Sequence, residues 1–350
     1  IVSHRKKCVT KVIENTYFCS MIVEQNIERL RYLLSLFKMR ENDLLSEINE
    51  GRKRLIRREQ VFSPQIDVKI LKKIDKIFDK GLSFYLDPTP LQQTEAMSVF
   101  FRKQSFSCPL NFTAKKLVDD YEGLKNYLSS LDILSEIETV PTIKHCTIAT
   151  NPHNAAERVR QLIYPKRKCS KSRDFLKNLI NNLADQGILV VEFIEAPNKK
   201  DKANIDGFFL EPNFIVLKRQ SYYKREIFTL LHELGHYMLN NEDIESLDVA
   251  NMNYASLSAI ERWCNDFAYY FLVGEQYEIM DKIQYADGTN DYCHPIIEQI
   301  ANTSFISRHA LFTRLLYSKR ISQSDYENVV RDLKEQYDRI KQKNASALMD

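Results

Sequence analysis

The chain has 350 residues, 44% of them hydrophobic, and this length allows two domains that each bury a core. Its 50 Lys and Arg residues nearly balance 47 Asp and Glu residues, which excludes a protein that binds nucleic acid through overall charge. Seven cysteines without a CxxC pair favour reduced thiols and a cytoplasmic location. No apolar run reaches the roughly 18 to 20 residues of a membrane span, so we expect a soluble protein with no membrane partner.

Residues 1–88 are expected to form an all-α domain, because apolar residues recur with helical spacing in short stretches between residues 27 and 78. Parts of these stretches, residues 30–33, 39–45 and 70–77, resemble a degenerate helix-turn-helix of the phage-repressor type. The basic segment 51–58 could bind DNA phosphates. A charge run is more often a solvated surface, so direct DNA binding is not favoured.

Two prolines in residues 86–90 predict a linker after this domain. Residues 89–170 are expected to be a helical connecting region, with helices over residues 112–134 and 151–163. At the other end of the chain, residues 276–350 are expected to form a C-terminal helical region.

Residues 171–275 are expected to form the functional core. Helical periodicity over residues 172–184 leads through Gly187 into a first strand at 188–194, and two more strands are expected at 207–210 and 213–217. These strands predict a small sheet packed on the helix that follows. The expected fold class is therefore α+β and predominantly helical.

The helix after the third strand carries His232, Glu233 and His236 in the order HExxH. Residues four apart lie one above the other on a helix, so the two imidazoles can bind one metal ion. Glu233 is rotated by about 100° from His232 and can instead act as general base. Apolar residues continue in register before and after the motif, which favours a helix with one buried face. Gly235 inside this helix indicates a close packing partner.

Catalytic zinc has three protein ligands and one open position, so a third donor is expected downstream. We favour Glu261, on a helix expected over residues 256–273, because a carboxylate beside its apolar face is out of place unless it is used. Three alternatives remain: Glu261 closes a capping box with Ser258, Asp266 is the ligand rather than the partner of Arg262, or Cys264 donates its sulfur. The five other histidines show no ligand-like spacing.

Together, the HExxH motif and the segment Glu261–Ala268, of the form ExxxNxFA, resemble the ImmA/IrrE-type metallopeptidases. The likeness extends over roughly residues 170–320 and includes Asp206-Gly207-Phe208 before the helix. It implies a zincin-like domain with zinc bound by His232, His236 and Glu261, and with Glu233 catalytic. Asn265 matches an asparagine of the pattern, and we expect it to orient the site. The resemblance leaves open whether zinc or manganese is the working metal.

The resemblance also implies the function: a zinc-dependent endopeptidase that cleaves a helix-turn-helix repressor and so derepresses stress, phage-defence or mobile-element genes. The donor of a hydrogen bond to the developing negative charge is unassigned, with Tyr237, His294 and His309 as candidates. Two other functions stay open. One is a DNA- or protein-binding regulator whose metal site is structural, and the other is a metal-dependent hydrolase of non-peptide bonds.

Overall fold

The structure is a computed structural model, which describes residues 21–90, 98, 100, 110–136, 140–165, 169–195, 201–220, 222–242, 257–283 and 294–346. The chain divides into two compact units. The first contains residues 1–104 and 115–119, and the second contains residues 105–114 and 120–350. Among the described helices, none combines the length and the hydropathy that crossing a bilayer requires.

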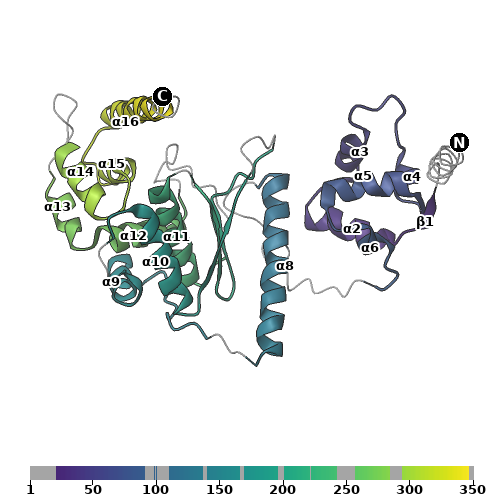
Figure 1. The fold of residues 1–350 in the computed structure, drawn as a ribbon, viewed down its shortest axis with the longest axis horizontal. Coiled ribbons are helices and arrows are strands. Elements are labelled where there is room, and N and C mark those ends of the chain that lie inside the picture. The colour runs from purple at the N-terminus through teal and green to yellow at the C-terminus, as the bar shows by residue number, and fades with distance from the viewer. Residues whose placement is uncertain are drawn as a thin grey trace, which may run out of the picture. The chain divides into compact units, whose positions relative to one another are not determined.

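The first unit is a small helical bundle with a two-stranded ribbon (Figure 1). Its elements are β1 (Ile22–Glu24), α2 (Ile27–Leu36), α3 (Glu41–Asn49), α4 (Arg58–Val61), β2 (Gln65–Asp67), α5 (Val68–Phe78) and α6 (Leu82–Leu86). The expectation of an all-α domain is wrong in one respect, because β1 and β2 pair in antiparallel. Strands of three residues are too short to show a periodicity of two. Between α3 and α5, where a helix-turn-helix would have its recognition helix, α4 has a single turn. The helix-turn-helix likeness therefore stays a prediction.

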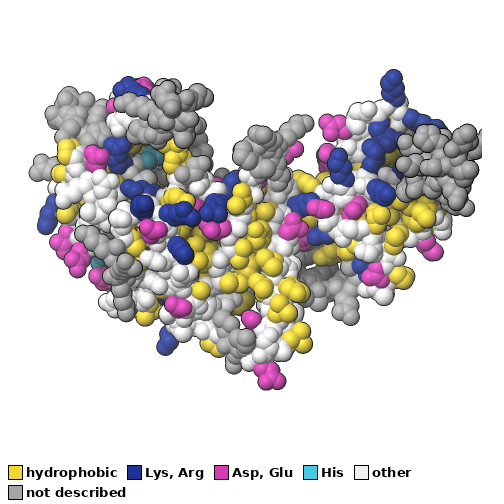
Figure 2. All heavy atoms as spheres, in the orientation of Figure 1, with side chains coloured by type: hydrophobic (Ala, Val, Ile, Leu, Met, Phe, Trp, Pro, Cys, Tyr) yellow, Lys and Arg dark blue, Asp and Glu magenta, His cyan; other side chains and the backbone are white. Residues whose placement is uncertain are grey.

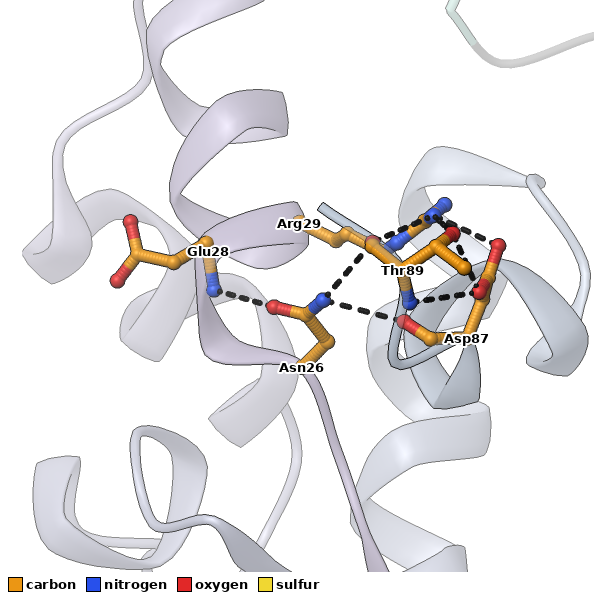
Figure 3. Close-up of polar contacts among 5 residues, drawn as sticks. All are labelled: Asn26, Glu28, Arg29, Asp87 and Thr89. Carbon is orange, nitrogen blue, oxygen red and sulfur yellow. Dashed lines mark hydrogen bonds and ion pairs between the residues drawn. The ribbon is translucent and has the colours of Figure 1, made fainter. Parts of the chain in front are cut away.

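The segment predicted as a linker is bound to the start of α2 as far as Thr89 (Figure 3). Arg29 forms an ion pair with Asp87 at 2.7 Å and donates to the carbonyl of Thr89 at 3.1 Å. Asn26 caps α2 by accepting from the N–H of Glu28, and its amide nitrogen donates to the carbonyl of Asp87. Residues 87–89 therefore belong to the first unit. The sequence did not indicate this because the contacts with Asp87 and Thr89 cross 58 to 61 residues.

The long helix α8 (Phe112–Leu134) contributes to both units, since its residues 115–119 group with the first and the remainder with the second. Within the first unit, Lys116 pairs with Asp79 at 3.0 Å, and Asp119 pairs with Lys80. The predicted connecting region is thus divided between the two units. Its boundaries, like the other predicted domain limits, remain predictions.

The second unit contains a three-stranded sheet in the order β3-β5-β4. β3 (Leu189–Phe193) is parallel to β5 (Phe214–Lys218), and β4 (Gly207–Leu210) is antiparallel to β5. All residues of β4 and all but the last of β5 are buried, as expected for strands covered on both faces. The three strands lie within two residues of their predicted limits.

Helices cover both faces of this sheet (Figure 1). Neighbouring residues of a strand point to opposite faces. Phe209 packs its ring against Tyr237 of α11 (Tyr223–Met238), whereas Phe208 packs against Tyr121 of α8. A neighbouring face of α8 is exposed at Leu124, Tyr127, Leu131 and Leu134, and Figure 2 shows hydrophobic side chains gathered in this part of the surface.

The remaining helices of the second unit share one hydrophobic core with α11. They are α9 (Pro152–Ile163), α10 (Ser172–Ala184), α12 (Ala259–Val273), α13 (Tyr277–Lys282), α14 (His294–Thr303), α15 (Arg308–Tyr317) and α16 (Gln323–Ser346). α11 therefore has the sheet on one side and α12 on another. The helix-rich architecture with small sheets agrees with the predicted α+β class.

Candidate metal centre

The helix α11 supplies the two histidines of the site from a fully buried position. Its predicted apolar face is confirmed, since Ile227, Leu230, Leu231, Leu234 and Met238 are all inaccessible to solvent. His232 and His236 occupy successive turns, and their Nε2 atoms lie 3.1 Å apart. Both rings are at most 1% exposed. Two imidazoles thus point at the same interior point.

The third group at this point is the carboxylate of Glu261, in the first turn of α12. Its two oxygens lie 3.1 Å from Nε2 of His232 and 3.1 Å from Nε2 of His236. Ser258 accepts a hydrogen bond from the backbone N–H of Glu261, so it caps α12. The carboxylate itself points at the histidines, however, and not at the helix start. The capping-box interpretation explains the backbone of Glu261 but not its side chain.

The orientation of these donor groups fits a cation between them. Nδ1 of His232 lies 3.1 Å from the amide oxygen of Asn265, which only accepts hydrogen bonds. Nδ1 therefore carries the proton, and Nε2 directs a lone pair at His236 and Glu261. Two donors that each bind a tetrahedral zinc ion at about 2.05 Å are about 3.3 Å apart, close to the spacing here. His232, His236 and Glu261 fit a zinc ion and leave one position open.

The burial of the Glu261 carboxylate also favours a cation at this point. Burial opposes ionisation of Glu261, but the close contacts with His232 and His236 outweigh it and hold the pKa of this carboxyl below its ordinary value. A buried carboxylate is costly unless a positive charge compensates it. Within the described part of the chain, this trio is the one group of three His, Cys, Asp or Glu side chains whose ligand atoms converge.

Glu233 lies beside the trio, on the side of α11 that faces the edge strand β4. It is 4% exposed, and its Cγ would be 3.3 Å from a Cβ atom placed on Gly207. Glu233 therefore occupies the gap between the motif helix and the edge of the sheet. The motif spacing predicted this separation of Glu233 from the two histidines.

The packing partner predicted for Gly235 is α12. A Cβ atom on Gly235 would lie 3.0 Å from Cα, Cβ and Sγ of Cys264. This close approach brings Glu261 within reach of the histidines. Cys264 is a buried thiol on the helix interface and is not part of the converging trio.

The rival ligand Asp266 is held elsewhere. It forms an ion pair with Arg314 of α15, whose guanidinium also lies 4.7 Å from the ring centre of Tyr269. Asp266 is half-buried. Arg314 lies 48 residues further along the chain, so helical spacing within one element could not indicate this pair.

The candidate donors to developing negative charge do not gather at the site. The hydroxyl of Tyr237 donates to the carbonyl of Ile143 at 2.6 Å, and Nε2 of His309 lies 3.0 Å from the hydroxyl of Tyr326. The side chain of His294 lies outside the described residues. This role stays unassigned. His145 and His153 are in structural contacts, as expected, with Tyr237 and with Tyr270 and Tyr277.

Sequence reasoning named Gly207 only within the segment Asp206-Gly207-Phe208, without a role, and missed Thr229. Thr229 lies one turn before Glu233 on α11, and its methyl group lies over Gly207. A glycine at the start of an otherwise bulky strand was the available signal, because glycine in a strand marks a close backbone approach.

A motif helix with two histidines, a second helix with a carboxylate and a neighbouring antiparallel edge strand are compatible with a metallopeptidase-type domain. Residues 184–286 match the family model of the IrrE N-terminal-like domain, peptidase family M78, and they include all four proposed site residues. This match supports the resemblance to the ImmA/IrrE family that the motifs predicted. No curated protein matches the chain.

Proposed function

We propose that this protein is a zinc-dependent endopeptidase, with His232, His236 and Glu261 as metal ligands and Glu233 as general base. The observation that carries the proposal is the convergence of three buried donor groups, 3.1 Å apart. Closed structural zinc sites have four ligands, usually Cys and His, so a trio with an open position fits catalysis better than a structural role.

A zinc ion held by His232, His236 and Glu261 would supply Lewis-acid chemistry for the hydrolysis of a peptide bond. Glu233 would take a proton from the attacking water and return it to the leaving nitrogen. Asn265 fixes the tautomer and the orientation of His232 through the 3.1 Å hydrogen bond to Nδ1.

The edge strand β4 offers a place for an extended substrate. The N–H of Lys218 donates to the carbonyl of Asp206 at 2.7 Å, so this pair is a hydrogen-bonded one. Such pairs alternate along an antiparallel ladder, and Gly207 and Phe209 therefore direct their N–H and C=O groups away from β5. A peptide that pairs with these groups lies next to Glu233.

We propose a helix-turn-helix repressor as the substrate, on the basis of the family resemblance. The test is to incubate the purified protein with the helix-turn-helix protein encoded beside it, with and without a chelator. We expect one discrete cut that disappears with chelator, returns with Zn²⁺ or Mn²⁺, and is absent in Glu233→Gln. Cleavage that survives both the chelator and this substitution would rule out the proposed mechanism, and an intact neighbour would rule out the proposed substrate.

A further inference from the structure

We propose that Gly207 is a positioning residue for the general base Glu233, because the missing side chain of Gly207 sets the gap in which Glu233 lies. This inference rests on the proposed function. It concerns the side of α11 that faces β4, about 100° around the helix from His232.

The space around Gly207 excludes any side chain. A Cβ atom there would lie 2.8 Å from Cγ2 of Thr229, 3.1 Å from the carbonyl oxygen of Val216 and 3.3 Å from Cγ of Glu233. Real Cβ atoms essentially never approach another atom to below 3.0 Å. The φ angle of Gly207 is not positive, so space and not backbone conformation requires glycine here.

Neither of the two nearest neighbours can retreat cheaply. The Oγ1 of Thr229 donates to the carbonyl of Arg225 at 3.1 Å, and turning its methyl group away from Gly207 would break this bond. Thr229 is also β-branched, 2% exposed and held in a helix, which leaves it few rotamers. The Val216 carbonyl belongs to the central strand β5 of the sheet.

Nor can α11 move away from β4 as a rigid body. On its other side, Gly235 already lies so close to α12 that a single added Cβ atom would be 3.0 Å from Cys264. The helix is thus fixed between the edge strand and α12 by two glycine contacts. A side chain at position 207 must be accommodated locally, and the flexible group that it meets is the side chain of Glu233.

The expected effect is selective. His232 and His236 contact Glu261 on α12, whereas Glu233 faces β4. A Cβ atom at position 207 therefore shifts the base with respect to the open metal position while the three ligands keep their contacts. This selectivity separates a positioning role from a general contribution to folding.

The experiment uses the full chain with Co²⁺ and acetohydroxamate as a probe, which requires no knowledge of the substrate. A hydroxamate binds the metal and shares its ionisable proton with the nearest carboxylate, so its affinity reports the position of Glu233. Co²⁺ binding and hydroxamate binding are both followed by the visible absorption of the cobalt ion. We expect Gly207→Ala to leave Co²⁺ affinity within twofold of the wild type and to weaken hydroxamate binding about tenfold, the loss of one good hydrogen bond.

Three further variants make the assignment specific. Thr229→Ser removes the methyl group at 2.8 Å but keeps the hydroxyl, and we expect it to restore hydroxamate binding in the Gly207→Ala background. In a Glu233→Gln background, Gly207→Ala should have no further effect. Gly123→Ala, at a glycine of α8 with nothing within 4 Å, is the control and should bind as the wild type does.

The outcomes separate the two proposals. Wild-type protein that fails to bind Co²⁺ would overturn the metal centre, and the positioning role with it. Co²⁺ binding with unchanged hydroxamate affinity in Gly207→Ala, or an equal loss in the Glu233→Gln background, would overturn the positioning role alone. A parallel loss of Co²⁺ affinity, or misfolding that Thr229→Ser does not rescue, would show that Gly207 acts on the fold and not on Glu233.

Discussion

The amide oxygen of Asn265 lies 3.1 Å from Nδ1 of His232, and Asn265 stands one helical turn after Glu261 on α12. One helix therefore supplies both a ligand and the hydrogen bond that orients another ligand. Outer groups of this kind change metal affinity by about 10- to 100-fold when they are removed.

We expect Asn265→Ala to lower zinc affinity by about tenfold or more, because His232 loses the acceptor that fixes its tautomer. Asn265→Asp keeps an acceptor at the same place. It should therefore bind zinc about tenfold or more tightly than Asn265→Ala does. Competition with a chromophoric chelator measures both affinities. Equal affinities for the wild type and Asn265→Ala would contradict this role.

Gly235 sets the distance between the two helices that bear ligands. Alanine would gain about 1 kcal/mol of helix propensity but would meet Cys264 at 3.0 Å, and overpacking of this kind costs about 1 to 3 kcal/mol. We expect Gly235→Ala to lower the free energy of unfolding and, since Glu261 moves away with α12, to lower zinc affinity. Urea unfolding of the apo form and zinc titration test the two effects. A stabilised variant with unchanged zinc affinity would show that the helices do not meet closely here.

The ion pair between Asp266 and Arg314 attaches α15 to α12. Both side chains are less than a quarter exposed, and removal of one partner leaves the other charge largely buried. We expect Asp266→Ala to cost about 2 kcal/mol of unfolding free energy, measured in urea. Glu335→Ala, which breaks the exposed pair with Arg339, is the matched control and should cause no measurable change. Similar losses of unfolding free energy in both variants would contradict the claim that burial makes the pair of Asp266 and Arg314 the more stabilising one.

The stability of the second unit should depend on the ionisation of Glu226. Burial, with the neighbouring Glu192, raises the pKa of Glu226 from 4.5 to about 8. Between these pH values the native state holds a proton that the unfolded state has released, so stability falls as pH rises, by at most about 1.4 kcal/mol per pH unit. Below pH 4.5 both the native and the unfolded state hold the proton, so stability does not depend on the ionisation of Glu226. We expect Glu226→Gln to flatten this dependence in unfolding experiments from pH 5 to 9, and an unchanged slope would assign it to other groups.

Local patterns predicted those parts of the fold whose signals lie within one element. The apolar face of α11, Gly235 as a point of close approach and the separation of Glu233 from His232 all follow from helical periodicity. Contacts between distant segments carried no such signal. The pairing of Asp266 with Arg314, the attachment of Asp87 to Arg29 and the approach of Gly207 to Glu233 each join residues 26 to 58 positions apart.

The ligand trio was predicted partly from a pattern within one element and partly across two elements. His232 and His236 follow from one helical motif, but Glu261 had to be chosen from a second helix on grounds of polarity alone. The structure brings its carboxylate to both imidazoles because two small contacts, at Gly235 and at the Ser258 cap, set the spacing and the start of α12. The sequence indicated a close partner at Gly235 and a cap at Ser258, but it did not indicate that α12 is the partner of Gly235.

The most direct test of the account is anomalous diffraction at the zinc absorption edge from crystals of the zinc-loaded protein. We predict one strong peak coordinated by Nε2 of His232, Nε2 of His236 and the carboxylate of Glu261, with one position left to solvent. A blank map between the two imidazoles, or a peak whose third protein ligand is a residue other than Glu261, would contradict it.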